Sequence, residues 1–243
     1  MRAHSREHLK RIRTATGDFD ADTPVYPNIN EHALRSAGAA MGAARSALNS
    51  KRVFSLMRPP GHHAARDRAM GFCYFNNVAI AALDALERTS ETSSAEGRCH
   101  RVAIWDFDGH HGNGTEAIVA HNERIRFASI HQFPAYPGTG AKSFANIDNY
   151  PVAPFTPRKE IVKIAKQSLE KLIRFKPSLL LVSAGFDAYA RDPLLQLTLE
   201  REDFATFGQW LNTIDLPVAV VLEGGYSDNL PELIDGFLSA WQS

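Results

Sequence analysis

The sequence predicts an α/β protein in which a mainly parallel central sheet lies between two layers of helices. Short, continuous apolar runs alternate with stretches of helical periodicity, which is the pattern of repeated β-α units. Each apolar run is too short for a typical helix and ends at Gly, Pro or a polar cluster. Because the strands of a parallel sheet are buried on both faces, these runs fit a three-layer αβα arrangement.

The elements follow in order along the chain. The predicted strands cover residues 53–57, 102–106, 126–130, 179–183 and 218–222. Asn28, with Glu31 three residues later, is interpreted as a capping pair that opens a helix running through residue 48. The polar, small-residue segment 89–100 is interpreted as a surface loop. Further helices are predicted over residues 77–88, 115–120, 159–175, 202–212 and 230–241.

The composition is that of an ordinary globular protein and predicts a single domain over residues 1–243. Apolar residues make up 44% and charged residues 22%, and 27 Lys plus Arg balance 27 Asp plus Glu. This zero net charge does not imply direct nucleic-acid binding. Because no signal peptide and no membrane-spanning apolar run are present, we expect a soluble, cytoplasmic protein. Cys73 and Cys99 lack C-x-x-C spacing, which argues against a disulfide framework or a structural zinc site.

Reactive side chains gather where the predicted strands end. In open α/β sheets, ligands bind outside the carboxyl ends of the strands. Asp106, Asp108 and His110 alternate after the strand at 102–106, so their side chains are expected to converge. Carboxylates and an imidazole are suitable ligands for a divalent metal. For an isolated motif of this kind, a helix cap formed by the two aspartates would be the simpler interpretation.

Three other segments argue against interpreting these aspartates only as a helix cap. Asp187 follows the strand at 179–183 and supplies a further carboxylate at the same sheet edge. His62 and His63 follow a Pro-Pro-Gly turn, and Tyr226 follows a Gly-Gly pair that allows a close approach of the backbone to a ligand. Taken singly, each of these could equally be an ordinary loop or turn residue.

In their order along the chain, these motifs resemble the successive signatures of histone deacetylases and their bacterial amidohydrolase relatives. The resemblance implies the arginase/deacetylase fold and zinc-dependent removal of acetyl groups from amines. The residues of the GHHGNGT motif are more similar to those of the class II and bacterial branches than to those of class I. The matching segments are RPPGHH (58–63), GFCYFNN (71–77), DFDGHHGNGTE (106–116), PGTG (137–140), SAGFDAYARDP (183–193) and LEGGY (222–226).

The resemblance implies one Zn²⁺ ion held by Asp108, His110 and Asp187. Three protein ligands leave one coordination position open, which a catalytic zinc ion needs and a structural one does not. Arginases share the fold but hold two manganese ions. Their late motif carries a second aspartate where this chain has Tyr189, so the two-metal interpretation is rejected.

The resemblance also assigns the proton chemistry. Asp106 would partner His62, and Asn113 would partner His63. A carboxylate favours the charged imidazolium, whereas a neutral amide does not. We therefore expect His63 to be the general base and acid, with His62 in electrostatic support. Tyr226 would donate its phenol proton to the developing oxyanion.

A narrow substrate channel is implied by similarity alone. Gly71, Phe72, Tyr136 and Leu194 would line it, with the two aromatic rings as its walls. Many relatives carry Phe in place of Tyr136, so this wall is expected to be slightly more polar here. The family also binds a structural potassium ion, whose ligands would here belong to Asp106, Asp108, His110, Ser129 and Ile130.

The substrate is harder to predict than the reaction. Relatives begin upstream of the segment resembling residues 4–9, so the single deacetylase domain is expected to lack the N-terminal part usual in the family. Polyamine deacetylases place an acidic residue where this chain has Leu194, which favours acetyl-lysine side chains of proteins as the substrate. The alternatives are a small acyl-amine such as an acetylpolyamine, or a catalytically silent module that binds acyl-lysine. The sequence leaves a homo-oligomer open.

Overall fold

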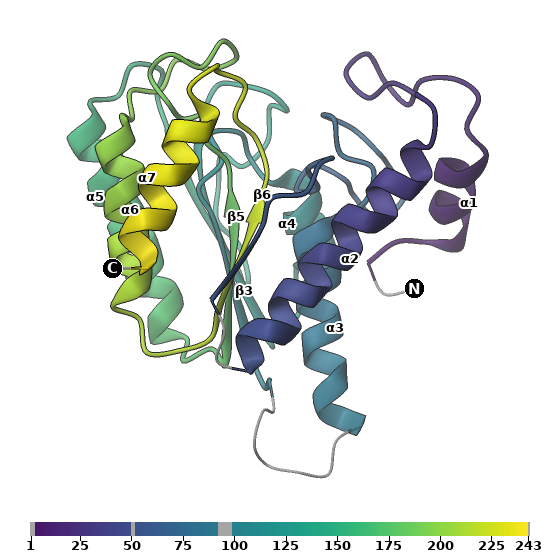
Figure 1. Ribbon diagram of the computed structural model, residues 1–243, viewed down its shortest axis with the longest axis horizontal. Helices are drawn as coiled ribbons and strands as arrows, with labels where there is room; N and C mark the ends of the chain where they lie inside the picture. Colours follow the sequence, from purple (N-terminus) through teal and green to yellow (C-terminus); the bar gives the residue numbers. More distant parts are fainter. Residues whose placement is uncertain (1–2, 50–51, 92–98, 243) are drawn as a thin grey trace.

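A parallel β-sheet runs through the middle of the protein, with helices on both sides (Figure 1). The computed structural model describes residues 3–49, 52–91 and 99–242. Within these residues the sheet has six strands in the order β1-β6-β5-β2-β3-β4, and every neighbouring pair is parallel. The predicted α/β class is therefore confirmed. The strands are β1 (Val53–Ser55), β2 (Val102–Asp106), β3 (Ile125–Gln132), β4 (Ile147–Val152), β5 (Leu179–Ala184) and β6 (Val218–Leu222).

The central strands are those that the apolar runs predicted. All residues of β2, β5 and β6 are buried, as expected for strands that are covered on both faces. The edge strand β4 was not predicted, because Asp148, Asn149 and Pro151 interrupt its apolar pattern. The Asp148 carboxylate is paired with Arg126 of β3 and with Lys171, so its charge is neutralised at the sheet edge.

Two groups of helices cover the two faces of the sheet. Trp105, Val182 and Val220 pack in one hydrophobic core with the helices α5, α6 and α7. Ile104 and Leu181, which point to the other face, pack in a second core with α2, α3 and α4. The helices are α1 (Arg6–Thr14), α2 (Ile29–Leu48), α3 (Asn77–Glu91), α4 (Asn113–Val119), α5 (Arg158–Arg174), α6 (Arg201–Asn212) and α7 (Leu230–Gln242).

The helix over residues 28–48 is confirmed, but its predicted capping pair is wrong. Asn28 adopts the left-handed conformation (φ 62°) and its side chain makes no capping hydrogen bond. Asn tolerates this conformation better than most residues, because its short polar side chain can bond locally. Glu31 instead forms an ion pair with Arg35 on the helix surface.

The N-terminal helix α1 was not predicted, because it is highly charged and carries few apolar residues. Ser5 caps it by accepting a hydrogen bond from the His8 N–H at 3.1 Å. Its buried residues, His8 and Ile12, face a small third core that includes Tyr74 and Phe75. Helix α1 therefore packs against the segment that leads into α3.

The predicted loop at 89–100 begins later than expected, because α3 continues to Glu91. Residues 92–98 of that prediction lie outside the described residues. No helix in the described part of the chain is long and apolar enough to cross a membrane.

Candidate active site

Two strand ends bring three potential metal ligands together. Asp108 and His110 follow β2, and Asp187 follows β5, the strand beside it in the sheet. His110 Nδ1 lies 2.6 Å from Asp187 Oδ2 and 3.4 Å from Asp108 Oδ1. One ligand atom from each residue lies within 4.8 Å of the other two, and all three residues are buried. The sequence-predicted trio therefore meets in space.

The donor set fits a divalent cation. Burying two carboxylates is unfavourable unless they are paired with cations or bind a metal ion. No Lys or Arg among the described residues forms an ion pair with Asp108 or Asp187. A side chain at Gly185 would place its Cβ 2.0 Å from Asp108 Oδ2, so the backbone must approach the carboxylate closely here. Two carboxylate ligands and one imidazole are typical of zinc and related metals.

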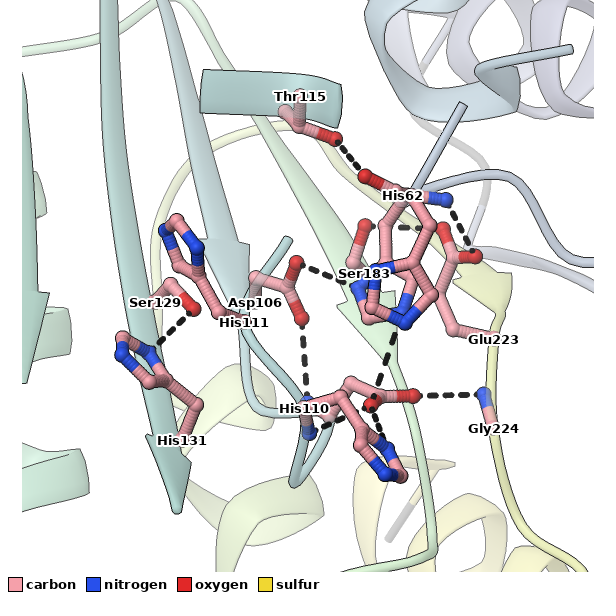
Figure 2. Close-up of polar contacts among 12 residues, drawn as sticks. His62, Asp106, His110, His111, Thr115, Ser129, His131, Ser183, Glu223 and Gly224 are labelled. Atoms are coloured by element: carbon pink, nitrogen blue, oxygen red, sulfur yellow. Dashed lines mark hydrogen bonds and ion pairs between the residues drawn. The ribbon is translucent and has the colours of Figure 1, made fainter. Parts of the chain in front are cut away.

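The two neighbouring histidines have different partners. His62 Nδ1 lies 3.1 Å from Asp106 Oδ2, as Figure 2 shows, and His62 Nε2 lies 3.6 Å from Asp108 Oδ1. His63 Nδ1 lies 2.7 Å from Asn113 Oδ1 at the first residue of α4. The two rings are 4.1 Å apart between centroids. The pairing that the family resemblance implied is therefore what the structure shows.

Burial and nearby charges shift the pKa values of the two rings in opposite directions. Burial alone would lower the pKa of His62, but the charges of Asp108 and Asp106 outweigh it and raise the pKa well above its ordinary value. Burial, followed by the charge of His62, lowers the pKa of His63 well below its ordinary value. These shifts favour the charged form of His62 and the neutral form of His63.

Tyr226 is held by residues to which the sequence reasoning gave no role. The backbone N–H of Tyr226 donates to Asp192 Oδ2 at 2.8 Å. Arg58 donates to the Gly225 carbonyl at 3.1 Å, and its guanidinium lies 5.6 Å from the centre of the Tyr226 ring. Burial, reinforced by nearby Asp108, raises the pKa of the Tyr226 phenol, which therefore stays protonated as a hydrogen-bond donor. Arg58 and Asp192 both lie inside motifs quoted above, and this position was the sequence evidence that could have indicated their role.

The predicted channel residues Gly71 and Tyr136 lie beside His63, whereas Phe72 lies beside Tyr226. The Tyr136 ring meets the His63 ring edge to face at 5.2 Å, and Phe72 lies 5.6 Å from Tyr226. A Cβ on Gly71 would lie 2.6 Å from the His63 ring, and its φ of +56° also favours glycine. Leu194 is exposed, and its N–H donates to Asp192, the residue that also binds Tyr226.

Acidic residues near Tyr136 were missed by the sequence reasoning. Burial raises the pKa of the Tyr136 phenol to about 12, and the charges of Asp20 and Asp22 contribute to this shift. Phe72 N–H donates to Thr23 at 3.2 Å, so the segment carrying these aspartates contacts the aromatic wall. We call Asp20 and Asp22 the acidic rim. The only sequence signal was the charge-rich stretch GDFDAD at 17–22, far from every motif.

The residues proposed for potassium also lie together in part. Asp106, the last residue of β2, is paired in register with Ser129 inside β3, and Ile130 follows Ser129. Asp108 and His110 lie just beyond the end of β2, and Figure 2 shows Ser129 beside His131 with its hydroxyl 3.0 Å from His131 Nδ1. The potassium ion itself stays a prediction.

Comparison with known proteins places the chain in a family. Residues 1–240 match the family described as Histone deacetylase domain. The chain belongs to this family. Its fold agrees: the crystal structure of acetylpolyamine aminohydrolase from Burkholderia pseudomallei is similar with a TM-score of 0.83 and 32% identity, covering 94% of this chain and 68% of that one. The resemblance drawn from the motifs and the predicted arginase/deacetylase fold are both confirmed.

Two curated relatives show how far the similarity extends. An uncharacterized protein of Synechocystis sp. is 43% identical over 243 residues, covering 96% of this chain and 77% of that protein. The acetylpolyamine amidohydrolase of Mycoplana ramosa is 35% identical over 227 residues, covering 88% of this chain and 62% of that protein. Family membership and the name of the Mycoplana relative support a deacetylase or amidohydrolase activity for this chain.

Proposed function

We propose that this chain is a metal-dependent amidohydrolase that removes acetyl groups from small cationic amines of the acetylpolyamine class. The observation that carries the proposal is the meeting of a buried Asp-His-Asp ligand set with a neutral histidine. Asp108, His110 and Asp187 offer ligand atoms within 4.8 Å of one another. His63, whose ring centroid is 6.0 Å from that of His110, lies beside this set.

The ligand trio would hold one divalent ion, which we propose to be zinc. When bound, such an ion activates water as a nucleophile and polarises the acyl carbonyl. The trio's surroundings support this role, because Gly224 N–H and Gly109 N–H each donate to a ligand carboxylate at 2.7 Å. These hydrogen bonds orient Asp108 and Asp187 toward a common point.

His63 would move the protons. Asn113 Oδ1 accepts the hydrogen of His63 Nδ1, which leaves Nε2 as the basic atom of the neutral ring. As the water oxygen bonds to the acyl carbon, Nε2 takes the water proton. When the carbon–nitrogen bond breaks, the same atom returns the proton to the leaving amine. The products, acetic acid and the amine, then exchange the second water proton to give acetate and the ammonium form of the amine.

Tyr226 and His62 would stabilise the charge that develops. The Tyr226 phenol remains protonated and would donate a hydrogen bond to the oxygen of the tetrahedral intermediate. The positive charge on His62, held by Asp106 and Asp108, favours the buildup of negative charge nearby.

The acidic rim supports a cationic substrate. The sequence favoured acetyl-lysine, since Leu194 offers no counter-charge. Asp20 and Asp22, whose charges raise the pKa of Tyr136 while that of Arg68 lowers it, would supply that charge from a different segment. An acetylated polyamine carries ammonium groups beyond its acetyl end, and carboxylates at the entrance would attract them. The names of the relatives point to the same substrate class.

The test is turnover by the purified protein of two substrates at equal concentration, acetylspermidine and an acetyl-lysine peptide. We expect acetylspermidine to be the better substrate by kcat/KM, and a chelator to abolish turnover until a divalent ion is restored. Metal analysis of the same preparation should find about one divalent ion per chain. Preference for the peptide would overturn the substrate class. Binding of acyl-lysine without turnover would instead support the silent-module alternative.

A further inference from the structure

A buried carboxylate outside the ligand trio holds the backbone that carries the histidine pair. Glu223 directly follows β6 and is completely buried. Its Oε2 accepts hydrogen bonds from Gly61 N–H at 2.7 Å and from His62 N–H at 3.1 Å. Its Oε1 accepts one from the Ser183 hydroxyl at 3.0 Å, as Figure 2 shows. Glu223 thus connects the ends of β5 and β6 to the loop between β1 and α3.

The carboxylate of Glu223 has no Lys or Arg partner among the residues described, so these donors compensate its burial. Two backbone N–H groups converge on one oxygen of Glu223, and burial raises the pKa of this carboxyl to about 7. A carboxyl oxygen can accept both hydrogen bonds in either protonation state. Because β6 is a central strand of the sheet, its end is a rigid support for the loop.

The next peptide group, between His62 and His63, is fixed as well. The His62 carbonyl accepts hydrogen bonds from Gly114 N–H and Thr115 N–H, both at 3.0 Å, at the start of α4. Asn113, the partner of His63, is the first residue of this same helix. The backbone of His62 is therefore held between Glu223 on one side and α4 on the other, and this sets where both rings point.

The geometry points to Glu223 as a positioning residue for the histidine pair, acting through the Gly61 and His62 amides without touching the substrate. This inference rests on the proposed function for its kinetic consequence. Its structural part, the placement of the His62 and His63 rings, stands independently of any turnover.

Two substitutions separate the hydrogen bonds of Glu223 from its charge. In Glu223→Gln, the amide oxygen can still accept both backbone N–H groups, whereas Glu223→Met keeps the chain length but removes every acceptor. Small misplacements of a reacting group can cost about 10²-fold in rate. We therefore expect Glu223→Met to lower kcat by about 10²-fold with KM and bound metal unchanged, and Glu223→Gln to restore most of kcat.

Ser183→Ala is the matched control, because it removes only the hydrogen bond to the opposite oxygen of Glu223. It should leave kcat within about threefold of the wild type, on the scale of one neutral hydrogen bond. The proposal is overturned if Glu223→Met keeps wild-type kcat, if Glu223→Gln is as impaired as Glu223→Met, or if the loss lies in KM or in bound metal.

An NMR readout keeps the inference separate from the proposed activity. Imidazole signals of His62 and His63, assigned with His62→Ala and His63→Ala, should shift in Glu223→Met and stay close to wild type in Glu223→Gln and Ser183→Ala. A wild-type protein without turnover that shows this pattern would overturn the proposed function but support the positioning role. Unchanged signals in a folded Glu223→Met protein would overturn the positioning role itself.

Discussion

His63 Nδ1 lies 2.7 Å from Asn113 Oδ1, and this contact makes His63 chemically different from the ring beside it. Since the amide oxygen can only accept, the hydrogen of the neutral His63 ring must sit on Nδ1. Burial and the charge of His62 lower the pKa of His63 well below its ordinary value. The protein therefore keeps one ring of an adjacent pair available as a base.

Replacing the amide by a carboxylate should change the pH dependence of the reaction. In Asn113→Asp, the negative charge of the carboxylate beside Nδ1 favours the protonated ring and raises the pKa of His63. The base is then protonated up to a higher pH, so the acid limb of kcat/KM should move to higher pH. Asn122→Asp makes the same charge change away from the site and should leave the profile unmoved. An unshifted profile in Asn113→Asp would mean that the acid limb belongs to another group.

Removal of the His63 ring should stop proton transfer without releasing the metal. In His63→Ala we expect kcat to fall by about 10²–10⁴-fold, the usual contribution of a positioned acid–base group. Metal content should match the wild type, because the trio of Asp108, His110 and Asp187 is intact. Steady-state kinetics and metal analysis on the same sample check both statements. Loss of the ion would show that His63 is a ligand.

Removal of the Tyr226 hydroxyl should affect the transition state more than substrate binding. In Tyr226→Phe the ring keeps its packing against Phe72, whose centroid is 5.6 Å away, and only the donor is lost. We expect kcat to fall by about 10²–10³-fold with little change in KM. An unchanged kcat would remove Tyr226 from the mechanism.

The core strands could be predicted from the sequence because their signals are local, whereas the choice of the ligand trio came from the resemblance of the motifs to a known family. Strands β2, β5 and β6 are continuous apolar runs, and Asp108, His110 and Asp187 follow two of them at one sheet edge. Strand β4 has no such local signal, since the charge of Asp148 is balanced by Arg126 and Lys171 from other elements.

The acidic rim could not be predicted for a related reason. Nothing within residues 17–22 shows that Asp20 and Asp22 lie near Tyr136, more than a hundred positions later. Their position depends on how the segment between α1 and α2 packs against the aromatic wall, for example through the Thr23 hydroxyl and Phe72 N–H. The substrate preference for acetyl-lysine was inferred from Leu194 alone, without the segment that carries Asp20 and Asp22.

The acidic rim gives a prediction on specificity. In the double variant Asp20→Asn, Asp22→Asn, KM for acetylspermidine should rise by roughly threefold to tenfold, as expected for the loss of exposed charge pairs. Salt should weaken the difference from the wild type. Turnover of a neutral acetylated amine in the same variant is the control and should be unchanged. An equal loss on both substrates would show that the rim stabilises the fold, not the cationic end of the substrate.

The buried pair His4 and His8 should make the free energy of unfolding depend on pH. Their rings stack at 4.8 Å, His4 Nε2 accepts from Asn76 N–H at 2.8 Å, and His8 Nε2 lies 2.8 Å from the Tyr74 carbonyl. Burial, then the charge of His8, lowers the pKa of His4 from 6.5 to about 4. Between these values the unfolded chain binds more protons than the folded one.

The free energy of unfolding should therefore fall as the pH drops from about 6.5 to about 4, with His4 contributing up to about 3 kcal/mol. In His4→Gln, the amide oxygen can still accept from Asn76 N–H, but the titrating ring is gone. This variant should be less stable than the wild type at pH 7, and the difference should narrow as the pH falls. Urea unfolding at a series of pH values measures this, with His100→Gln, at an exposed position, as the matched control. A constant difference between His4→Gln and the wild type from pH 7 to pH 4 would contradict the assignment, because the slope must vanish with the group that causes it.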